Sequence, residues 1–380
     1  MSLKSSFVSY LHQKHPQLSV SLLDALISEE LLSPFQVIIS KKQVDSLKNE
    51  ITTYWHLRNW GVKNLTTQFA TYGLRRPDNY SVCMSYDFHI NSSGQPELIE
   101  VNTNASFLAL GLELYHFLNL PNPAGTFNET SLVEMFLNEI ELCKIESRAY
   151  TKIKTNAIAI VDENPEQQRL YLEFLIYKSI FEKHGLAADV FNITEINKFK
   201  DFALVYNRYT DFYLQEGKSA EIKRLFNEGH INLSPQPCEY FLLGDKQRFL
   251  DWNQQSEIEK PLSLLKTYDL GAEDKDKIWT ERKNLFFKPK TSFGGKQVYR
   301  GASISQKMFS DIFNQNFIAQ QLSIPSLVSV VMNEKKQDFK YDLRCFVYKN
   351  ELQLIVARLY QGQTTNLKNY GGGFACVTAT

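Results

Sequence analysis

The first seventy residues read as helical. Apolar residues recur there at roughly three- and four-residue spacing, which places their side chains on one face of an α-helix. A proline inside a helix removes a backbone hydrogen bond, so we expect Pro16 to divide this stretch into two helices. The apolar positions that carry the pattern are Phe7, Leu11, Leu18, Leu22, Leu23 and Leu26.

The pattern changes at Ser81. The segment SVCMSYDFHI is followed by the polar stretch NSSG and then by QPELIEVN. Two apolar runs on either side of a short polar stretch with glycine are typical of an antiparallel hairpin. We therefore expect two strands here, joined by a tight turn.

Residues 126–240 alternate between the two kinds of pattern. A helix is predicted over 126–150, a strand over 156–162, and a second helix from Pro165 to Lys183. The strands ADVFNI and FALVYNRY, a helix at about 218–228 and the short strand INLSP follow. This alternation predicts a parallel, Rossmann-like lobe. It contains no GxGxxG sequence, so dinucleotide binding has no support.

Composition narrows the class of protein. Of 380 residues 43% are hydrophobic and 22% charged, which is typical of a folded globular protein of two or three lobes. Lys+Arg and Asp+Glu each count 42, and this zero net charge argues against a general nucleic-acid or membrane-surface binder.

Cellular context is also suggested by the sequence. We find no signal-peptide pattern at the N-terminus and no run of ~18 apolar residues, so we expect a cytoplasmic protein without a spanning helix. The cysteines are scattered, without metal-binding spacing, and are expected to be reduced: Cys83, Cys143, Cys238, Cys345 and Cys376.

The first candidate site is a pair of metal ligands, Glu100 and Asn102. Residues two apart in a strand point to the same face, and carboxylate and amide oxygens suit Mg²⁺. If the hairpin turns at Ser93–Gly94, Asp87 lies opposite Glu100. Two facing carboxylates repel unless a cation lies between them or each faces solvent. The alternative is an acidic strand at a solvated edge.

A second candidate site is LFFKPKTSFGGKQVYRG. An apolar strand ends at Lys288, and glycines in the loop after it would let backbone N–H groups approach phosphate oxygens. The loop residues that we assign to the phosphates are Ser292, Gly294, Gly295 and Lys296. The segment is not a P-loop, because Gln297 follows GGK, and an ordinary glycine hairpin is the alternative. Lys246 is a candidate second phosphate lysine or else a solvated helix start.

The third candidate site is the C-terminal hairpin. A turn at Asn350 would place Asp342 opposite Arg358, with Arg344 on the face of Asp342. A surface ion pair is the alternative. Three consecutive glycines, 371–373, follow, and they indicate either a close approach of ligand or a flexible tail. Neither a histidine metal motif nor a Ser or Cys nucleophile motif is present, so covalent catalysis is disfavoured and His89 is interpreted as structural.

Together these segments resemble the ATP-grasp superfamily. The ordered set is GDK with Lys246, FKP with Lys288 before a Gly-Gly loop, FIAQQLSIP, and DLR…ARLY…TN…GGG. In most members the E-x-N strand follows the glycine loop, whereas here LIEVNTNASF lies near the front. This order is similar to the circularly permuted ATP-grasp enzymes, such as eukaryotic-type glutathione synthetase and glutathionylspermidine synthetase-like proteins. The resemblance covers about 80–120 and 200–380.

The resemblance implies an α/β fold built from α+β lobes: a circularly permuted ATP-grasp fold with a Rossmann-like substrate lobe. The domains would be 1–125, with the helical segment and the permuted strands, 126–240, the substrate lobe, and 241–380, the nucleotide lobe with the C-terminal strands. ATP and Mg²⁺ would be the cofactors. Glu100, Asn102 and Asp342 would hold Mg²⁺, with Asp87 a further candidate.

The resemblance also assigns the remaining site residues. Lys246 and Lys288 would grip phosphates while the loop 291–296 closes. Gln320, Gln321 and Leu322 would line the adenine slot largely through backbone groups, although Gln320-Gln321 stands where an acidic residue commonly contacts the ribose. Arg344, Arg358 and Asn366 would face the substrate carboxylate and its acyl-phosphate.

The expected reaction joins a small-molecule carboxylate to an amine, with no nucleic-acid or membrane partner and with a homodimer left open. Small amino acids, peptides and polyamine-like molecules are candidate substrates. A small-molecule kinase on the same scaffold and a non-catalytic nucleotide-binding module are the alternatives. Arg75, Arg76 and Arg208 are candidate carboxylate binders, with surface arginines the competing interpretation.

Overall fold

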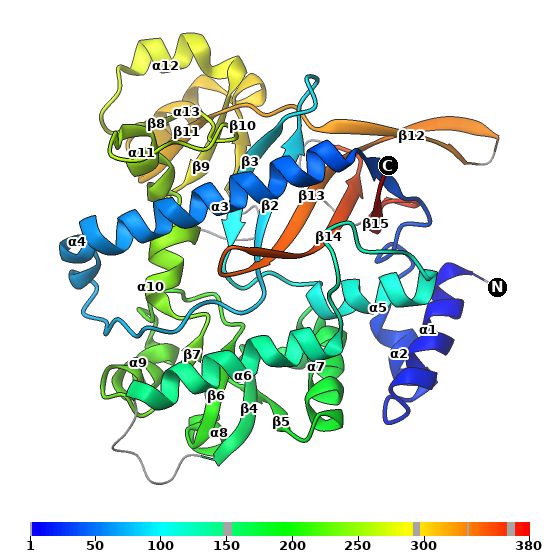
Figure 1. Ribbon diagram of the computed structural model, residues 1–380. Coiled ribbons are helices and arrows are strands. Elements are labelled where there is room, and N and C mark those ends of the chain that lie inside the picture. The colour runs from blue at the N-terminus through cyan, green and yellow to red at the C-terminus, as the bar shows by residue number, and fades with distance from the viewer. Residues whose placement is uncertain (1, 147–153, 292–296, 333, 363–368) are drawn as a thin grey trace.

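The computed structural model describes residues 2–146, 154–291, 297–332, 334–362 and 369–380. The chain forms three β-sheets with helices packed around them (Figure 1). The strands of the largest sheet are β1 (Val37–Ile39), β2 (Met84–Ile90), β3 (Pro96–Asn102), β12 (Ser326–Met332), β13 (Lys335–Tyr348), β14 (Glu351–Tyr360) and β15 (Gly373–Ala379). Their order is β1-β15-β14-β13-β2-β3, and β12 pairs with β13 beside this path.

The large sheet is built from both ends of the chain. Strand β2, from the front, pairs antiparallel with β13, from the tail. Both predicted hairpins are present, and their predicted registers are confirmed: Asp87 lies opposite Glu100, and Asp342 lies opposite Arg358. Residues near 100 and near 342 therefore share one sheet.

The N-terminal region is mainly helical, as predicted. Its helices are α1 (Leu3–Lys14), α2 (Val20–Leu26), α3 (Lys41–Asn64) and α4 (Thr66–Ala70). The predicted break is confirmed, because α1 ends at Lys14, just before Pro16. Ser40 caps α3 in a reciprocal capping box with Gln43. The short strand β1, which pairs parallel with β15, interrupts the region and is too short to give a periodic signal.

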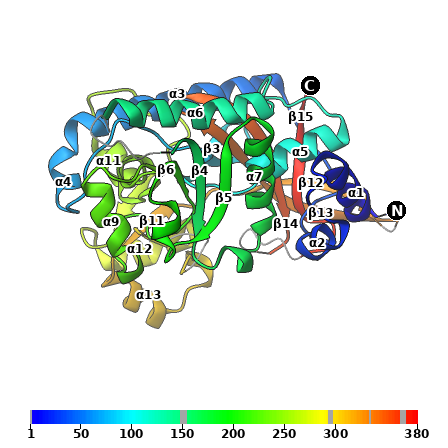
Figure 2. The same cartoon turned by 90° about the horizontal axis from the view of Figure 1, so that it is seen from below.

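The second sheet lies in the middle of the chain. Its strands are β4 (Lys154–Asp162), β5 (Ala187–Asn192), β6 (Phe202–Asn207) and β7 (Leu233–Ser234), in the order β5-β4-β6-β7. Every pairing in it is parallel, so the predicted parallel sheet is confirmed. The associated helices are α6 (Glu129–Glu146), η1 (Pro165–Gln167), α7 (Tyr171–Lys183), α8 (Ile196–Phe199), η2 (Gly217–Ser219) and α9 (Ala220–Asn227). Figure 2 shows β4, β5 and β6 side by side.

The third sheet contains the strand that carries Lys288. Its strands are β8 (Thr267–Asp269), β9 (Leu285–Pro289), β10 (Tyr299–Arg300) and β11 (Phe317–Gln321), in the order β10-β9-β11-β8. The helices around it and before it are α10 (Pro237–Glu239), η3 (Tyr240–Gly244), α11 (Gln247–Gln254), α12 (Lys275–Glu281), η4 (Arg282–Asn284), η5 (Gly301–Ser303) and α13 (Gln306–Phe313). Phe287, Phe309 and Phe317 form its small separate core.

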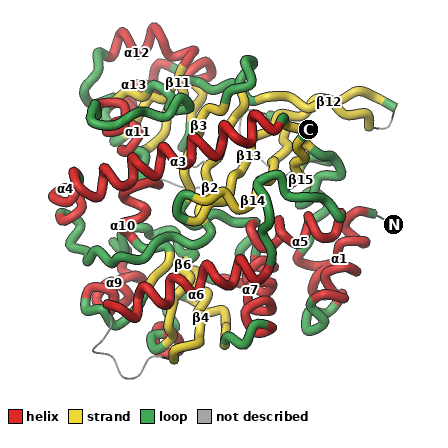
Figure 3. Tube along the Cα trace, in the orientation of Figure 1, coloured by secondary structure: helices red, strands yellow, loops and turns green. Residues whose placement is uncertain are grey.

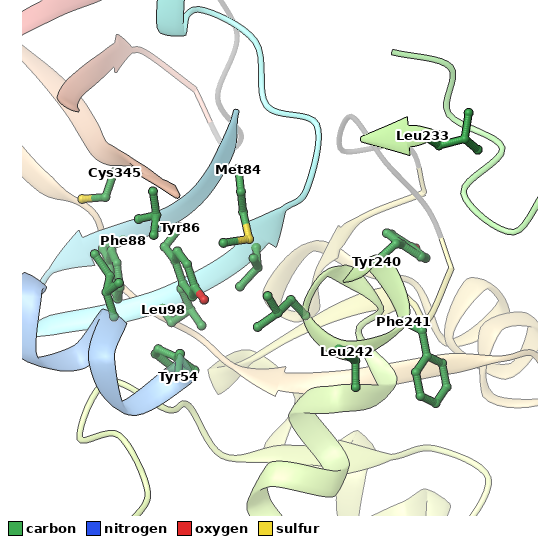
Figure 4. Close-up of a cluster of buried hydrophobic side chains, with 14 of the residues drawn as sticks. Tyr54, Met84, Tyr86, Phe88, Leu98, Leu233, Tyr240, Phe241, Leu242 and Cys345 are labelled. Carbon is green, nitrogen blue, oxygen red and sulfur yellow. The ribbon is translucent and has the colours of Figure 1, made fainter. Parts of the chain in front are cut away.

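One face of the large sheet is covered along its length by α3. Tyr54 of α3 packs against Tyr86 of β2, and Phe88, Leu98 and Leu242 belong to the same buried cluster (Figure 4). Along these strands every second side chain is apolar and points toward α3. This face of the sheet therefore packs in the core and does not line the candidate site.

The opposite face changes character along the strands. At one end it packs on α5 (Leu108–Leu118), where Val356 and Phe374 join the second buried cluster. At the other end the same face carries Asp87, Asp342 and Arg358. The candidate site thus lies at the part of this face that α5 leaves uncovered.

The three glycines near the C-terminus have a packing role. Gly373 has a φ of 117°, and a Cβ placed there would lie 2.7 Å from the backbone oxygen of Glu30. A Cβ on Gly372 would lie 2.8 Å from the backbone oxygen of Leu359. The glycines therefore let β15 pass close to the chain's own backbone, so an approaching ligand is not needed to explain them, and β15 is no flexible tail.

Among the described residues no helix combines the length and the apolar character that crossing a membrane requires. The cysteines follow the prediction, since all five are buried thiols.

Candidate active site

A pocket of about 690 Å³ lies at the polar end of the large sheet, where the third sheet and the loop before α7 approach it. Glu100 and Asn102 reach it from the front of the chain, and Lys288, Asp342 and Arg358 reach it from the tail. Its size is in the range of small-ligand sites. Sequence segments that are far apart therefore line one cavity.

Of the four residues predicted to hold a cation, Asp87 is not part of the pocket lining, and the other three are: Glu100, Asn102 and Asp342. The amide nitrogen of Asn102 donates to Glu100 Oε1 at 3.2 Å and to Asp87 Oδ2 at 3.1 Å. This orientation leaves the amide oxygen of Asn102 as its available donor atom for a cation. Two carboxylates and one amide oxygen at a pocket wall fit a hard divalent cation. Among the described residues no three His, Cys, Asp or Glu side chains cluster as a metal site, so the set depends on Asn102.

Asp87 is fully buried and bound by two arginines. Arg344 donates to it twice, from Nε at 3.0 Å and from Nη2 at 2.8 Å, and Arg358 Nη2 donates at 2.8 Å. Burial alone would raise the pKa of Asp87, but the charges of Arg344 and Arg358 outweigh it and hold the pKa at about 2. Guanidinium groups thus neutralise Asp87, one of the two facing carboxylates, while the other, Glu100, accepts a hydrogen bond from the amide of Asn102. The role of Asp87 as a metal ligand stays a prediction. The contacts of Asp87 suit a residue that anchors the two arginines.

The two arginines present different atoms to the pocket. Arg358 Nε donates to Asp342 Oδ1 at 2.6 Å, so Arg358 joins the two buried acids. No hydrogen bond among the described residues uses Nη1 of Arg358. Arg344 Nη1 donates to the backbone oxygen of Ser106 at 3.3 Å. Both side chains are fixed by charge-assisted hydrogen bonds at a pocket wall, as the binding of a carboxylate or phosphoryl oxygen requires.

Lys288 is buried at the end of β9. Its ammonium donates to the backbone oxygen of Ile99 at 2.9 Å and to Gln320 Oε1 at 2.7 Å. An ammonium has three N–H donors, so one remains for a ligand. Burial and the nearby charge of Lys246 lower the pKa of Lys288 to about 8, although Glu100 acts in the opposite direction. A buried cation with neutral partners is costly unless an anion joins it.

Lys246 lies just before α11 and is also buried. Burial lowers its pKa, and Glu100 and Asp245 partly restore it. Lys246 does not line the pocket, but its backbone N–H donates to the backbone oxygen of Lys290 at 3.2 Å, which places it near the end of β9. Of the two predicted phosphate lysines, only Lys288 lines the pocket together with Glu100.

The predicted adenine slot is on the pocket wall, since Gln320, Gln321 and Leu322 all line it. Gln320 Nε2 is a buried donor that has no hydrogen-bond partner among the described residues, so a ligand acceptor here would satisfy it. The backbone amides differ from expectation: Gln321 N–H donates to Lys266 O and Leu322 N–H to Asn284 O, each at 2.8 Å. These two amides are already used within the protein, so ligand recognition by these residues falls to side chains and carbonyl oxygens.

Part of the predicted site cannot be placed. Ser292, Gly294, Gly295, Lys296 and Asn366 lie outside the described residues. Their assignment stays a prediction.

Some pocket residues were not predicted. His89 lines the pocket and its Nδ1 lies 3.0 Å from Ser323 Oγ. Burial, with Lys288 and Arg358 nearby, lowers the pKa of His89 to about 4, so the ring is neutral at pH 7. Its position two residues after Asp87 on the same strand was the available signal. Arg169, from the loop before α7, also lines the pocket, and no local pattern marks it.

The three candidate substrate arginines lie outside the pocket lining. Arg208 is buried and donates to the backbone oxygen of Ala105 at 3.2 Å and to Ser106 Oγ at 2.5 Å. Arg75 stacks on Phe226 at 4.7 Å, and Arg76 donates to Thr66 Oγ1 at 3.2 Å. Arg208 thus supports the same loop that Arg344 contacts, and Arg75 and Arg76 have packing partners.

Comparisons with known proteins give distant likenesses. No family model matches the chain, and no curated protein matches it. A solved structure of a protein provisionally named gamma-glutamylcysteine synthetase, from Methylobacillus flagellatus KT, is 11% identical with a TM-score of 0.44 over 83% of each chain. The structure of the ATP-grasp ligase PsnB with minimal precursor, Mg and ADP is 11% identical with a TM-score of 0.29, over 58% of this chain and 87% of that one.

Proposed function

We propose that this chain is an ATP- and Mg²⁺-dependent carboxylate–amine ligase with a circularly permuted ATP-grasp fold. One observation supports this most: Glu100 and Asn102 from the front and Lys288, Asp342 and Arg358 from the tail line a single pocket. Of its lining residues six are basic and two are acidic, so the pocket suits an anionic ligand held with a cation. The six basic residues are Arg169, Lys288, Arg300, Lys340, Arg344 and Arg358.

Each group has a role in binding Mg²⁺-ATP. Glu100, Asn102 and Asp342 would hold Mg²⁺, which when bound neutralises phosphate charge. Lys288 and Lys246 would bind phosphate oxygens, and the loop 291–296 would cover them. Gln320, with its unpartnered Nε2, would meet the base. An anion here would also relieve the unfavourable burial of the two lysine charges.

The reaction follows from this charge arrangement. An oxygen of the substrate carboxylate attacks the γ-phosphorus, the bond to the bridging oxygen breaks, and ADP leaves with an acyl-phosphate formed. The amine nitrogen then attacks the acyl carbon, the carbon–oxygen bond breaks, and phosphate leaves as the nitrogen loses a proton. Arg344 and Arg358 would hold the carboxylate and then the acyl-phosphate. Positioning and charge stabilisation carry this chemistry, and no protein nucleophile is needed.

A phosphate-release screen tests the proposal. The full chain is incubated with ATP, Mg²⁺ and pairs drawn from amino acids, polyamines and short peptides, and products are identified by mass spectrometry. An amide with one free phosphate per amide is the expected result. A stable phosphorylated product would instead identify a kinase, and nucleotide binding without turnover on any pair would favour a non-catalytic module.

A further inference from the structure

The sheet face that carries the site continues outward beyond the pocket. Strand β13 runs from Arg344 and Asp342 toward the start of the strand, and every second residue points to the same side. Lys340, two residues from Asp342, lines the pocket, and so does Leu327, which lies directly opposite it on β12. The pocket wall and the outer hairpin are therefore one continuous surface.

In the outer part of this surface each facing pair combines a charged residue of β13 with an uncharged residue of β12. Past Lys340 and Leu327 the next facing pairs are Asp338 with Ser329 and Lys336 with Val331. We call these six residues the platform. From Lys340 to Lys336 the platform extends about 13 Å at the usual rise per residue. Leu327 is 59% exposed and Val331 is 74% exposed, and Ser329 lies between them on the same face.

The other face of the same hairpin is packed. Phe339 is fully buried, and its ring centroid lies 6.1 Å from that of Phe35. Met332 lies close to Gly371 on that side. The hairpin therefore packs against the rest of the chain through this face, and the platform lies on its other face. Figure 3 shows the backbone of the hairpin extending outward from the large sheet.

The edge of the platform is open as well. Within the described part of the chain β12 pairs with β13 alone, so its second edge offers unpaired backbone N–H and C=O groups. An extended peptide can use such an edge through main-chain hydrogen bonds while its side chains contact the face. Two lysines face one aspartate on the platform, and Arg169 and Arg300 line the adjoining pocket, so the surface complements acidic groups.

We propose that the platform binds an extended acidic peptide and that the reacting carboxylate belongs to this peptide. The inference rests on the proposed function, because it names the substrate class of the same pocket. Leu327 and Val331 would contact apolar side chains of the peptide, and Lys336 and Lys340 would pair with its carboxylates. The carboxylate at the inner end would then reach Arg344 and Arg358.

Fluorescence anisotropy with a defined probe tests the proposal. The full chain with Mg²⁺-ATP is titrated with a labelled octapeptide of glutamate and leucine, and with the same peptide carrying lysine for glutamate. The acidic peptide should bind and the basic one should not. Val331→Asp and Lys336→Glu should each weaken binding about fivefold or more, as expected for lost interface contacts. Ile38→Asp is the matched control, because Ile38 is 66% exposed on the opposite edge of the same sheet.

Three results would overturn the proposal: no binding of the acidic peptide, equal binding of the basic one, or equal losses in the Ile38→Asp control. The thermal shift caused by Mg²⁺-ATP is measured in parallel on every variant. If Mg²⁺-ATP raises the melting temperature normally but the acidic peptide does not bind, the platform proposal is wrong and the proposed function stands. If Mg²⁺-ATP causes no thermal shift in the wild type, the proposed function itself is wrong. Light scattering covers the competing occupant: a wild-type dimer that Val331→Asp converts to monomer would assign the platform to a second copy of the chain.

Discussion

Two buried charge clusters in this molecule have similar composition and different surroundings. In one, Asp87 binds Arg344 and Arg358 at a pocket wall. In the other, Glu113 of α5 lies 3.2 Å from Lys14 and accepts from Tyr10 at 2.7 Å, between packed helices. Both acids are fully buried and both have lowered pKa values.

The difference between the clusters lies in what each leaves available. The helix cluster lies between packed helices, outside the pocket lining, and tethers α1 to α5, so its charges serve structure. The sheet cluster borders a cavity in which Arg358, Lys288 and Asn102 still have atoms to offer a ligand. A buried charge by itself therefore does not mark a site; a buried charge beside a cavity with unused donors does.

The largest expected effect separates the two clusters by activity. Glu100→Gln should lower Mg²⁺-ATP turnover at least about 100-fold, because it removes charge that the phosphates' cation would need. Its fold should remain intact, since Glu100 is only partly buried. Phosphate release measures this, with Glu113→Gln as the matched variant in the helix cluster. Near-normal turnover of Glu100→Gln would refute the metal assignment.

Removing the anchor of the sheet cluster should reduce stability strongly. Asp87→Asn leaves two buried arginines without their shared anion and should lower the free energy of unfolding by about 3–5 kcal/mol. Urea unfolding measures it. Asp338→Asn on the neighbouring strand, where the exposed carboxylate accepts a hydrogen bond from Ser329, should change the free energy of unfolding by less than about 0.5 kcal/mol. Equal losses in the two variants would contradict the anchor role.

The helix cluster should show a smaller loss that is confined to stability. Glu113→Gln should lower the free energy of unfolding by about 1–3 kcal/mol, because the hydrogen bond from Tyr10 loses its charged acceptor and the ion pair with Lys14 is lost. Turnover per folded molecule should match the wild type. A turnover defect at a temperature where the variant is fully folded would show that the two clusters are coupled.

Low pH should weaken the interaction between Lys14 of the helix cluster and Glu129, the first residue of α6, over a defined pH range. The pKa of Glu129 is lowered to about 2 despite its burial, through hydrogen bonds from Lys183 and Lys14. A carboxylate with a lowered pKa stabilises the fold above its ordinary value of 4.5, and that contribution is lost as pH falls toward 2. Melting temperature against pH should therefore fall less steeply in Glu129→Gln than in the wild type. Parallel curves for the two proteins would remove this interpretation.

The smallest expected effect on stability comes from the lysine of the pocket. Lowering the pKa of Lys288 from 10.5 to about 8 means that its charge is unfavourable by ~3 kcal/mol in the folded protein. Lys288→Met removes that cost but loses two hydrogen bonds of about 1 kcal/mol each, so stability should rise by only about 1 kcal/mol. Mg²⁺-ATP binding should be lost in the same variant.

The sign of the pH dependence follows for the wild type. The unfolded chain keeps the proton of Lys288 up to about pH 10.5, whereas the folded chain loses it near pH 8, so stability should rise across this range. ATP affinity should fall over the same interval because the charge that binds phosphate disappears. Calorimetric titration and melting curves at matched pH values check both, and a rise of affinity with pH would contradict the assignment.

The sequence predicted the parts of the fold that depend on local pattern. The turns of the two hairpins fixed the registers of Asp87 with Glu100 and of Asp342 with Arg358. Helix α5 was not predicted, because its residues are buried on all sides and show no polar face.

Contacts between segments that are far apart in the sequence could not be predicted from local patterns. The pairing of β2 with β13 places Asp87 opposite Arg344, and no local pattern reveals it. The sequence therefore identified several charged residues of the site, such as Glu100, Lys288 and Asp342, but could not show that Arg344 neutralises Asp87. His89 could be placed on the site's strand face, yet only the folded pocket shows that it lies in the cavity.

The central claim is that the front and the tail of the chain hold one divalent cation beside a nucleotide. Replacing Mg²⁺ with Fe²⁺ and adding ascorbate and peroxide cuts a polypeptide next to the bound metal, and mass spectrometry locates the cuts. With ATP present, we predict cuts near residues 100–102 and near residue 342 in the same molecules, both suppressed by excess Mg²⁺. Cleavage at one of these places alone, or at neither, would contradict the claim.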